Sequence, residues 1–294
     1  MLPATRFIGI DIEQDKKNGR IFLHQHSYTV KLLDKFNMGN CNPKLTPSDP
    51  NVRFTKDGNP QEETADEEPL IGRYREILGG IMYLAVSTRP DIAQALNVLA
   101  RFAENPKKEH MTGAKHLLAY LKGTTTRGLL FDAGHPTILT GYADADFGGD
   151  LIERKSTSGY IFLLSGGPIV WASRRQECVA QSTTEAELIS VNEATREAVW
   201  LKRMLEELEP CSTSQIEIKC DNQSAIQLTN NSELHRRSKH IELKHFYVRQ
   251  EQLKKNVKIV YIDSLNQLAD GLTKGLPRPR FEELWSKLGV ISGK

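Results

Sequence analysis

The stretch Gly141-Tyr-Ala-Asp-Ala-Asp-Phe147 decides how the second half of this 294-residue chain is interpreted. It begins within a short apolar run, residues 138–142, and it places acidic residues where that run ends. Later segments share this character, because each has an acid where a predicted element ends or begins: Ser182-Thr-Thr-Glu-Ala-Glu-Leu188, Ile216-Glu-Ile-Lys-Cys-Asp-Asn222 and Asn266-Gln-Leu-Ala-Asp-Gly271. The acids that stand out are Asp144, Glu187, Asp221 and Asp270.

Acids placed in this way suggest a particular chemistry. Carboxylates at the ends of several elements can converge on one point and hold two hard divalent cations. Two such ions, about 4 Å apart, can clamp the attacking and leaving oxygens of a phosphodiester without any protein nucleophile. Hydrolysis of a nucleic-acid strand is therefore the first hypothesis.

Around these acids the sequence predicts a mixed sheet flanked by helices. Apolar runs separated by Gly and Ser clusters predict a three-stranded antiparallel meander at residues 138–142, 159–164 and 169–172. A long amphipathic helix is expected from 184 to 208. The remaining elements are expected to be a strand at 216–220, helices at 223–229 and 240–255, a strand at 257–262 and a closing helix that begins within 266–272.

Each acid alone has an ordinary interpretation. Asp144 could be a solvated residue at a strand end, Glu187 could form a capping box with Thr184, and Asp221 could cap the next helix. Asp270 could be a surface position. If the strands before Asp144 and Asp221 are adjacent, however, both carboxylates lie at one edge of the sheet, and the four acids together favour a shared site.

The first half of the chain predicts a hairpin followed by helices. Two β-rich runs, residues 6–12 and 20–24, flank the polar turn Asp15-Lys-Lys-Asn-Gly19. Apolar residues at helical spacing follow at 28–36, and residues 43–69 have the composition of a loop or linker. Further helices are expected at 74–86, from 92 to a point before Pro106, and at 109–121. A structural platform is the simpler interpretation of this helical block.

The composition fits a globular protein. The chain is 39% hydrophobic and 26% charged, and a net charge of +2 is too small to indicate nucleic-acid binding by itself. The four cysteines lack CxxC spacing, which favours reduced thiols over a zinc site or a disulfide framework. No apolar run reaches the roughly 18 residues of a membrane span, and no signal-peptide core is present. We therefore expect a soluble, intracellular protein that is not secreted.

Several long motifs occur in a characteristic order: Tyr142-Ala-Asp-Ala-Asp146, Arg154-Lys-Ser-Thr-Ser-Gly-Tyr160, Gln181-Ser-Thr-Thr-Glu-Ala-Glu187, Cys220-Asp-Asn222, Lys239-His-Ile241 and Gln267-Leu-Ala-Asp-Gly-Leu-Thr-Lys274. In these motifs the segment 138–275 resembles the type I ribonuclease H domain of copia-type retrotransposon Pol proteins. The resemblance implies an α/β fold, with a five-stranded mixed sheet and flanking helices.

The resemblance also implies a function for the four acids. Asp144, Glu187, Asp221 and Asp270 match the catalytic residues that bind two Mg²⁺ or Mn²⁺ ions and cut the RNA strand of an RNA–DNA hybrid. Asp146 and Glu185 are near-neighbour alternatives at two of these positions.

The resemblance extends upstream through Phe7-Ile-Gly-Ile10, Thr46-Pro47, Gly80-Ile-Met-Tyr-Leu-Ala85 and Thr88-Arg-Pro-Asp91. These look like the thumb and connection of the reverse transcriptase in the same Pol proteins. The implied regions are a thumb-like hairpin, helix and linker at 1–65, a helical connection at 66–135, a ribonuclease H-like domain at 136–276 and a C-terminal tail at 277–294. The polymerase signature Tyr-x-Asp-Asp is absent, so polymerase activity is not expected.

Substrate contacts are expected from cationic and polar side chains. Residues 231–258 contain eight Lys or Arg but only three Glu, which suits phosphates, although a solvated helix face explains the same pattern. The candidates for contacting a hybrid are Lys155, Ser156, Thr157, Arg174, Arg175, Asn222, Arg236, Arg237 and Lys239. A polar hairpin turn is the alternative for the first three. The expected partners are an RNA–DNA hybrid and other parts of a replication complex, located in a cytoplasmic particle or the nucleus.

Two competing hypotheses stay open from the sequence. The chain could be a non-catalytic transposon-derived fragment that binds nucleic acid or protein, since the polymerase centre is missing. It could also be an integrase-like or transposase nuclease, although a set of four acids argues against this.

Overall fold

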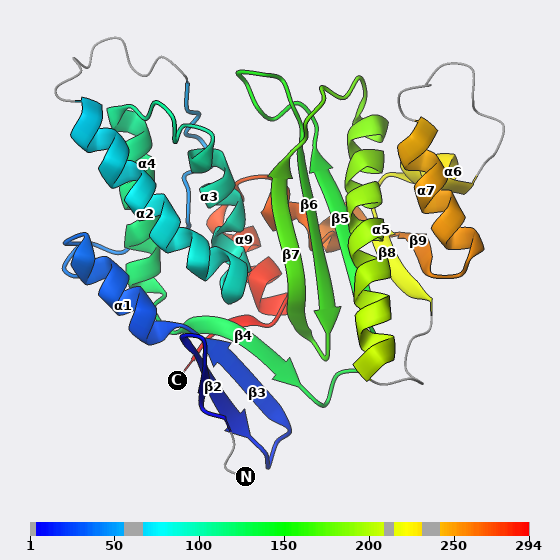
Figure 1. Ribbon diagram of the computed structural model, residues 1–294, viewed down its shortest axis with the longest axis horizontal. Helices are drawn as coiled ribbons and strands as arrows, with labels where there is room; N and C mark the ends of the chain where they lie inside the picture. The colour runs from blue at the N-terminus through cyan, green and yellow to red at the C-terminus, as the bar shows by residue number, and fades with distance from the viewer. Residues whose placement is uncertain (1–3, 56–66, 209–214, 231–241, 294) are drawn as a thin grey trace. The chain divides into compact units, whose positions relative to one another are not determined.

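The computed structural model describes residues 4–55, 67–208, 215–230 and 242–293 (Figure 1). The chain divides into two compact units. The first comprises Met1–Pro136, Ser165–Gly167 and Gly275–Lys294, and the second comprises Thr137–Leu164 and Pro168–Lys274. Within the described ranges, no helix is both long and apolar enough to cross a bilayer.

The second unit is built on a five-stranded mixed sheet in the order β7-β6-β5-β8-β9. Its strands are β5 (Thr140–Asp146), β6 (Thr157–Leu164), β7 (Gly167–Arg175), β8 (Ile216–Cys220) and β9 (Val257–Tyr261). Strands β5 and β6 are antiparallel, whereas β8 is parallel to both of its neighbours. The predicted five-stranded mixed sheet with flanking helices is thus confirmed.

Helix α5 (Thr183–Leu208) covers one face of this sheet, with α6 (Gln223–Asn230) and α7 (Glu242–Leu253) beside it (Figure 1). Val191, Ala194, Ala198 and Leu201 recur on one side of α5 and are fully buried against the sheet. This spacing is that of an amphipathic helix on a core, so burial of the apolar stripe fixes the orientation of α5. The orientation of α5 in turn decides where the acids near its beginning point.

The first unit contains a second five-stranded sheet, in the order β1-β2-β3-β4-β10. Its strands are β1 (Arg6–Phe7), β2 (Ile10–Asp15), β3 (Arg20–His24), β4 (Arg127–Asp132) and β10 (Val290–Ser292), and all its pairings are antiparallel. The predicted hairpin is present as β2 and β3. Its first strand is interrupted, because Ile8 and Gly9 have φ values of 44° and 72° and cannot continue an extended strand.

The helices of the first unit are α1 (His26–Lys35), α2 (Glu67–Ser87), η1 (Pro90–Ile92), α3 (Ala93–Ala100), α4 (Lys108–Gly123) and α9 (Arg278–Lys287). Helix α9 and strand β10 occupy the region predicted as a tail. Strand β10 pairs with β4, so the end of the chain belongs to the sheet of the first unit.

A buried ionic network holds the turn between α2 and α3 in the first unit. The guanidinium of Arg89 donates to both carboxylate oxygens of Asp91, at 2.9 and 2.8 Å. The hydroxyl of Tyr120 donates to Asp91 at 2.6 Å, and Arg127 donates to that hydroxyl. Arg89 and Asp91 are each only 1% exposed, and their pairing offsets the free-energy cost of removing both charges from water.

Candidate active site

Asp144 and Asp221 are neighbours because β5 and β8 are adjacent and parallel. The register pairs Tyr142 with Lys219, and each acid lies two residues further along its own strand direction. The expected adjacency of these strands is therefore confirmed. Asp144 does not end its strand, however, because β5 continues to Asp146. Asp144 is buried, whereas Asp221 is partly exposed.

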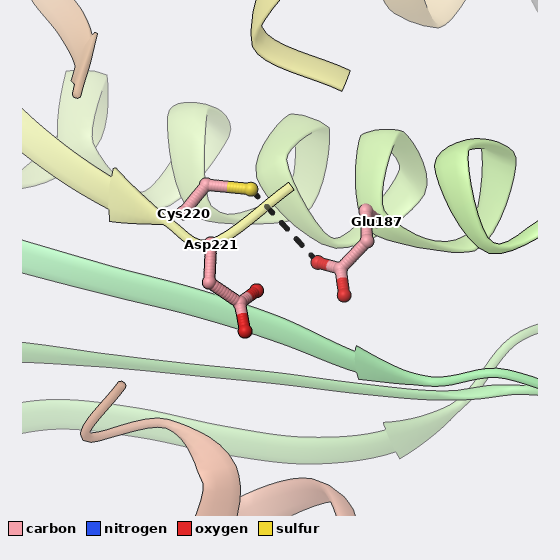
Figure 2. A group of neighbouring side chains, drawn as sticks. All are labelled: Glu187, Cys220 and Asp221. Atoms are coloured by element: carbon pink, nitrogen blue, oxygen red, sulfur yellow. Dashed lines mark hydrogen bonds between the residues drawn. The ribbon is translucent and has the colours of Figure 1, made fainter. Parts of the chain in front are cut away.

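Glu187 comes from α5 and faces the end of β8. Its carboxylate accepts a hydrogen bond from the backbone N–H of Ala145 in β5. The Sγ atom of Cys220 lies 3.9 Å from Glu187 Oε2. The ligand atoms of Glu187, Cys220 and Asp221 all lie within 4.8 Å of one another, and Figure 2 shows these side chains projecting into the same space. The helix and the sheet therefore contribute to one cluster.

Asp270 begins the short helix α8 (Asp270–Thr273), which packs on β5 and β6, and the charge of Asp270 acts on Asp144. Gln267 Nε2 donates to the carbonyl of Ala143 at 2.9 Å, and Thr273 Oγ1 donates to Asp144 Oδ2. These bonds tie α8 and the segment before it to β5. Just before α8 the chain forms η2 (Ser264–Asn266), whose Ser264 Oγ donates to Asp221 Oδ2 at 2.7 Å.

The close approach of α8 depends on a glycine opposite Asp144. Gly159 of β6 pairs with Asp144 in the antiparallel register. A Cβ atom at this position would lie 2.7 Å from Thr273 Cγ2 and 2.9 Å from Leu272 Cβ. Only glycine leaves room for α8 at this distance, so Gly159 positions Asp270 without touching it.

The charges of these acids influence one another. Burial raises the pKa of Asp144, and the charges of Asp270 and Asp221 act in the same direction. Burial also raises the pKa of Glu187, again with contributions from the charges of Asp144 and Asp221. Asp144 is therefore within electrostatic reach of Asp221, Asp270 and Glu187, and Glu187 is also within reach of Asp221. A buried cluster of like charges favours bound cations.

No protein-family model matches this chain. Curated relatives do. A retrovirus-related Pol polyprotein from transposon TNT 1-94 of Nicotiana tabacum is 42% identical over 292 residues, which cover 99% of this chain and 22% of that protein. The corresponding protein from transposon RE1 of Arabidopsis thaliana is 36% identical over 284 residues, covering 97% of this chain and 19% of that protein. The chain belongs to the copia-type retrotransposon Pol family.

The chain thus spans about a fifth of the length of these Pol relatives. Among solved structures, a ribonuclease H1 from the archaeon Halobacterium salinarum matches 46% of this chain and 93% of its own, at 17% identity and a TM-score of 0.34.

Glu185 and Asp146 are the near-neighbour alternatives to Glu187 and Asp144 in this Pol chain. The carboxylate of Glu185 accepts a hydrogen bond from the backbone N–H of Gln181 at 2.8 Å, and the backbone N–H of Glu185 donates to Ser182 Oγ at 3.1 Å. Glu185 therefore caps the beginning of α5. Asp146 ends β5 opposite Thr157 of β6. The charges of Asp144 and Asp221 act on Glu187, which supports the choice of Glu187 over Glu185.

Several residues predicted to contact substrate are engaged within the protein. Lys155 pairs with Glu153 at 2.8 Å, and Arg175 pairs with Asp150 at 2.9 Å. Ser156 is buried and accepts a hydrogen bond from the N–H of Gly148. These contacts stabilise the turn between β5 and β6, which corresponds to the polar-turn alternative.

The remaining candidates differ in accessibility. Thr157 is buried in β6, and Asn222 Oδ1 accepts from the N–H of Ala225 to cap α6. Arg174 is exposed on β7. Arg236, Arg237 and Lys239 lie outside the described residues, as does all of the cation-rich segment 231–258 before α7. Their role stays a prediction.

Sequence reasoning missed the residues that support the acids: Gly159, Ser264, Gln267, Thr273 and Lys274. Thr273 and Lys274 follow Asp270 at the spacing of one helical turn, which was the available signal. Lys274 Nζ lies 2.8 Å from Asp270 Oδ1. The contacts of Gly159 and Ser264 depend on the tertiary fold and leave no local pattern.

Proposed function

We propose that the second unit is a metal-dependent endonuclease that hydrolyses the RNA strand of RNA–DNA hybrids. Asp144, Glu187, Asp221 and Asp270 are the proposed catalytic residues. The observation that supports the proposal is that the charges of Asp221 and Asp270 act on the buried Asp144, and that the charges of Asp144 and Asp221 act on the buried Glu187. The resemblance of the motifs around these acids to the type I ribonuclease H domain of copia-type Pol proteins supports the same reaction.

The donor set fits two Mg²⁺ or Mn²⁺ ions. Carboxylate oxygens are the ligands that these hard cations prefer. Burial, together with the charge of Glu187, raises the pKa of the Cys220 thiol, so its sulfur stays protonated and is a poor ligand for a hard ion. Bound there, the ions would activate water and stabilise the charge that develops on the scissile phosphate.

The supporting side chains orient the acids for this role. Ser264 fixes one oxygen of Asp221, and Thr273 fixes one oxygen of Asp144. Gln267 locks the segment before α8 onto the backbone of β5. Each bond limits the rotation of a carboxylate or of its element, which is the preorganisation that a two-ion site requires.

We further propose that the hybrid, and other parts of a retrotransposon replication complex, are the partners of this chain, in an intracellular particle or the nucleus. The exposed Arg174 is the substrate contact best supported by its accessibility. Polymerase activity is not proposed, since the sequence lacks the Tyr-x-Asp-Asp signature.

A labelled RNA–DNA hybrid tests the proposal. The protein should cleave the RNA strand with Mg²⁺ and not with excess EDTA, and Asp221→Asn should lose at least about 100-fold in rate. Unchanged cleavage in Asp221→Asn would contradict the assignment. Salt-sensitive binding of the hybrid without turnover in the wild-type protein would instead support the non-catalytic, nucleic-acid-binding alternative.

A further inference from the structure

A lysine lies against the acidic cluster that the proposed function assigns to metal ions. Lys274 follows directly on α8, and its Nζ pairs with Asp270 Oδ1 at 2.8 Å. Its charge also acts on Asp144, Asp146 and Glu187. Its side chain is 49% exposed, so the ammonium lies at the edge of the cluster, in contact with solvent.

This position differs from that of an ordinary surface ion pair. An exposed lysine and carboxylate one helical turn apart stabilise a protein very little, because water screens them. Asp144, Glu187 and Asp270, by contrast, are all less than a tenth exposed, and their mutual repulsion is screened much less. A single positive charge beside these buried carboxylates therefore offsets their mutual repulsion.

The ammonium can move without moving α8. Helix α8 is held independently by the bond from Gln267 to Ala143 and by the bond from Thr273 to Asp144. Lys274 has a flexible four-carbon stem and lies just beyond the last residue of α8. Release of Asp270 by Lys274 is therefore a change of side-chain rotamer, and Asp270 stays in place for another cation.

We propose that Lys274 is an internal counter-ion of the acidic site, which holds Asp270 in the metal-free protein and gives up that contact when a divalent cation binds. Lys274 then sets how tightly the site binds metal and keeps the unloaded site folded. The inference rests on the proposed function, because it assumes that the four acids are the metal ligands. Lys274 is a positioning residue in this role.

Titration of the metal-free full-length protein with Mn²⁺, followed by calorimetry or by the electron paramagnetic resonance of free Mn²⁺, tests the proposal. Lys274→Met should bind Mn²⁺ about tenfold more tightly than the wild type, because a unit charge that repels the incoming ion has been removed. The same variant should melt at a lower temperature without metal, and saturating Mn²⁺ should reduce this difference. Lys274→Arg keeps the charge and should behave like the wild type in both measurements.

Lys254 provides a matched control. It pairs with Glu251 at 2.9 Å, its side chain is 52% exposed, and it belongs to the same unit. Lys254→Met should leave Mn²⁺ affinity unchanged. Lys274→Gln serves as a second neutral variant in case Lys274→Met does not fold.

The direction of the change in affinity decides the outcome. Unchanged or weaker Mn²⁺ binding in both neutral variants would overturn the proposal, since damage to the site weakens binding and only the removal of a competitor strengthens it. The failure of the proposed function is distinguishable. In that case the wild-type protein and Lys254→Met would show no Mn²⁺ binding at all, and both proposals would fall together.

Discussion

Gly159→Ala should disturb the candidate site without changing any side chain that forms it. The new Cβ would meet Thr273 Cγ2 at 2.7 Å and Leu272 Cβ at 2.9 Å. Carbon atoms in favourable contact are about 3.5 Å apart, so α8 must retreat from β6 by roughly 0.8 Å. A change in the rotamer of one side chain cannot relieve this clash, because the backbone carbon of Leu272 would also be only 3.2 Å from the new Cβ.

Two effects of known size follow from this displacement. Overpacking of a buried contact costs about 1–3 kcal/mol, and each kcal/mol lowers the melting temperature of a domain of this size by about 2–4 °C. Asp270 moves with α8, and a misplacement of roughly 1 Å in a catalytic group can lower the rate about 100-fold. The variant should therefore lose far more activity than stability.

Thermal melting and cleavage of a labelled RNA–DNA hybrid with Mg²⁺ measure the two effects. Gly79→Ala is the matched control, because a Cβ on this glycine of α2 would meet nothing within 4 Å. That variant should be neutral or stabilised by roughly 0.5–1 kcal/mol, as expected for alanine in a helix interior, and should cleave normally. Wild-type stability and activity in Gly159→Ala would refute the inference that this glycine positions α8.

Three further predictions concern the electrostatics and the buried contacts. The metal-free protein should lose stability as the pH rises from about 4 to about 9, because the pKa of Asp144 is raised to about 6 and that of Glu187 to about 9, so the folded state binds protons which the unfolded state has already released. Melting temperatures should show this decline, and Glu187→Gln or added Mg²⁺ should reduce it; a melting temperature that rises with pH would contradict the reasoning. Arg89→Met should lower the free energy of unfolding by about 3–5 kcal/mol, since it leaves Asp91 buried without its bidentate partner; urea unfolding measures this, and a loss below about 1 kcal/mol would argue against the network. Gln267→Leu should cost about 1–3 kcal/mol by removing the donor to the buried carbonyl of Ala143, and calorimetry that finds no destabilisation would show that this bond does not hold α8.

The mixed sheet of the second unit could be predicted because its determinants are local. Apolar runs of strand length, divided by Gly and Ser clusters, mark β5 to β7, and the helical spacing of Val191, Ala194 and Ala198 marks α5. The first sheet could be predicted only in part. Strand β4 pairs with β10, more than 150 residues later in the chain, and nothing in a short apolar segment such as β10 specifies a partner so distant.

The four acids could be found from their motifs, but the choice between neighbouring acids needed tertiary structure. Glu185 and Glu187 are both suitable for a helix N-terminus, and only the fold shows that Glu185 caps α5 while Glu187 faces Cys220. The same limit applies to Lys155 and Arg175. A cationic side chain beside a polar turn suggests a phosphate contact, whereas the structure places both residues in ion pairs with acids of that turn.

The most direct test of the account is the rate of hybrid cleavage with Mg²⁺ in paired variants of neighbouring acids. Asp144→Asn and Glu187→Gln should each lower the rate at least about 100-fold. Asp146→Asn and Glu185→Gln, which remove a charge two residues away on the same elements, should retain most of the wild-type rate. Equal loss within a pair, or full activity in Asp144→Asn or Glu187→Gln, would contradict the claim that Asp144, Glu187, Asp221 and Asp270 form the active site.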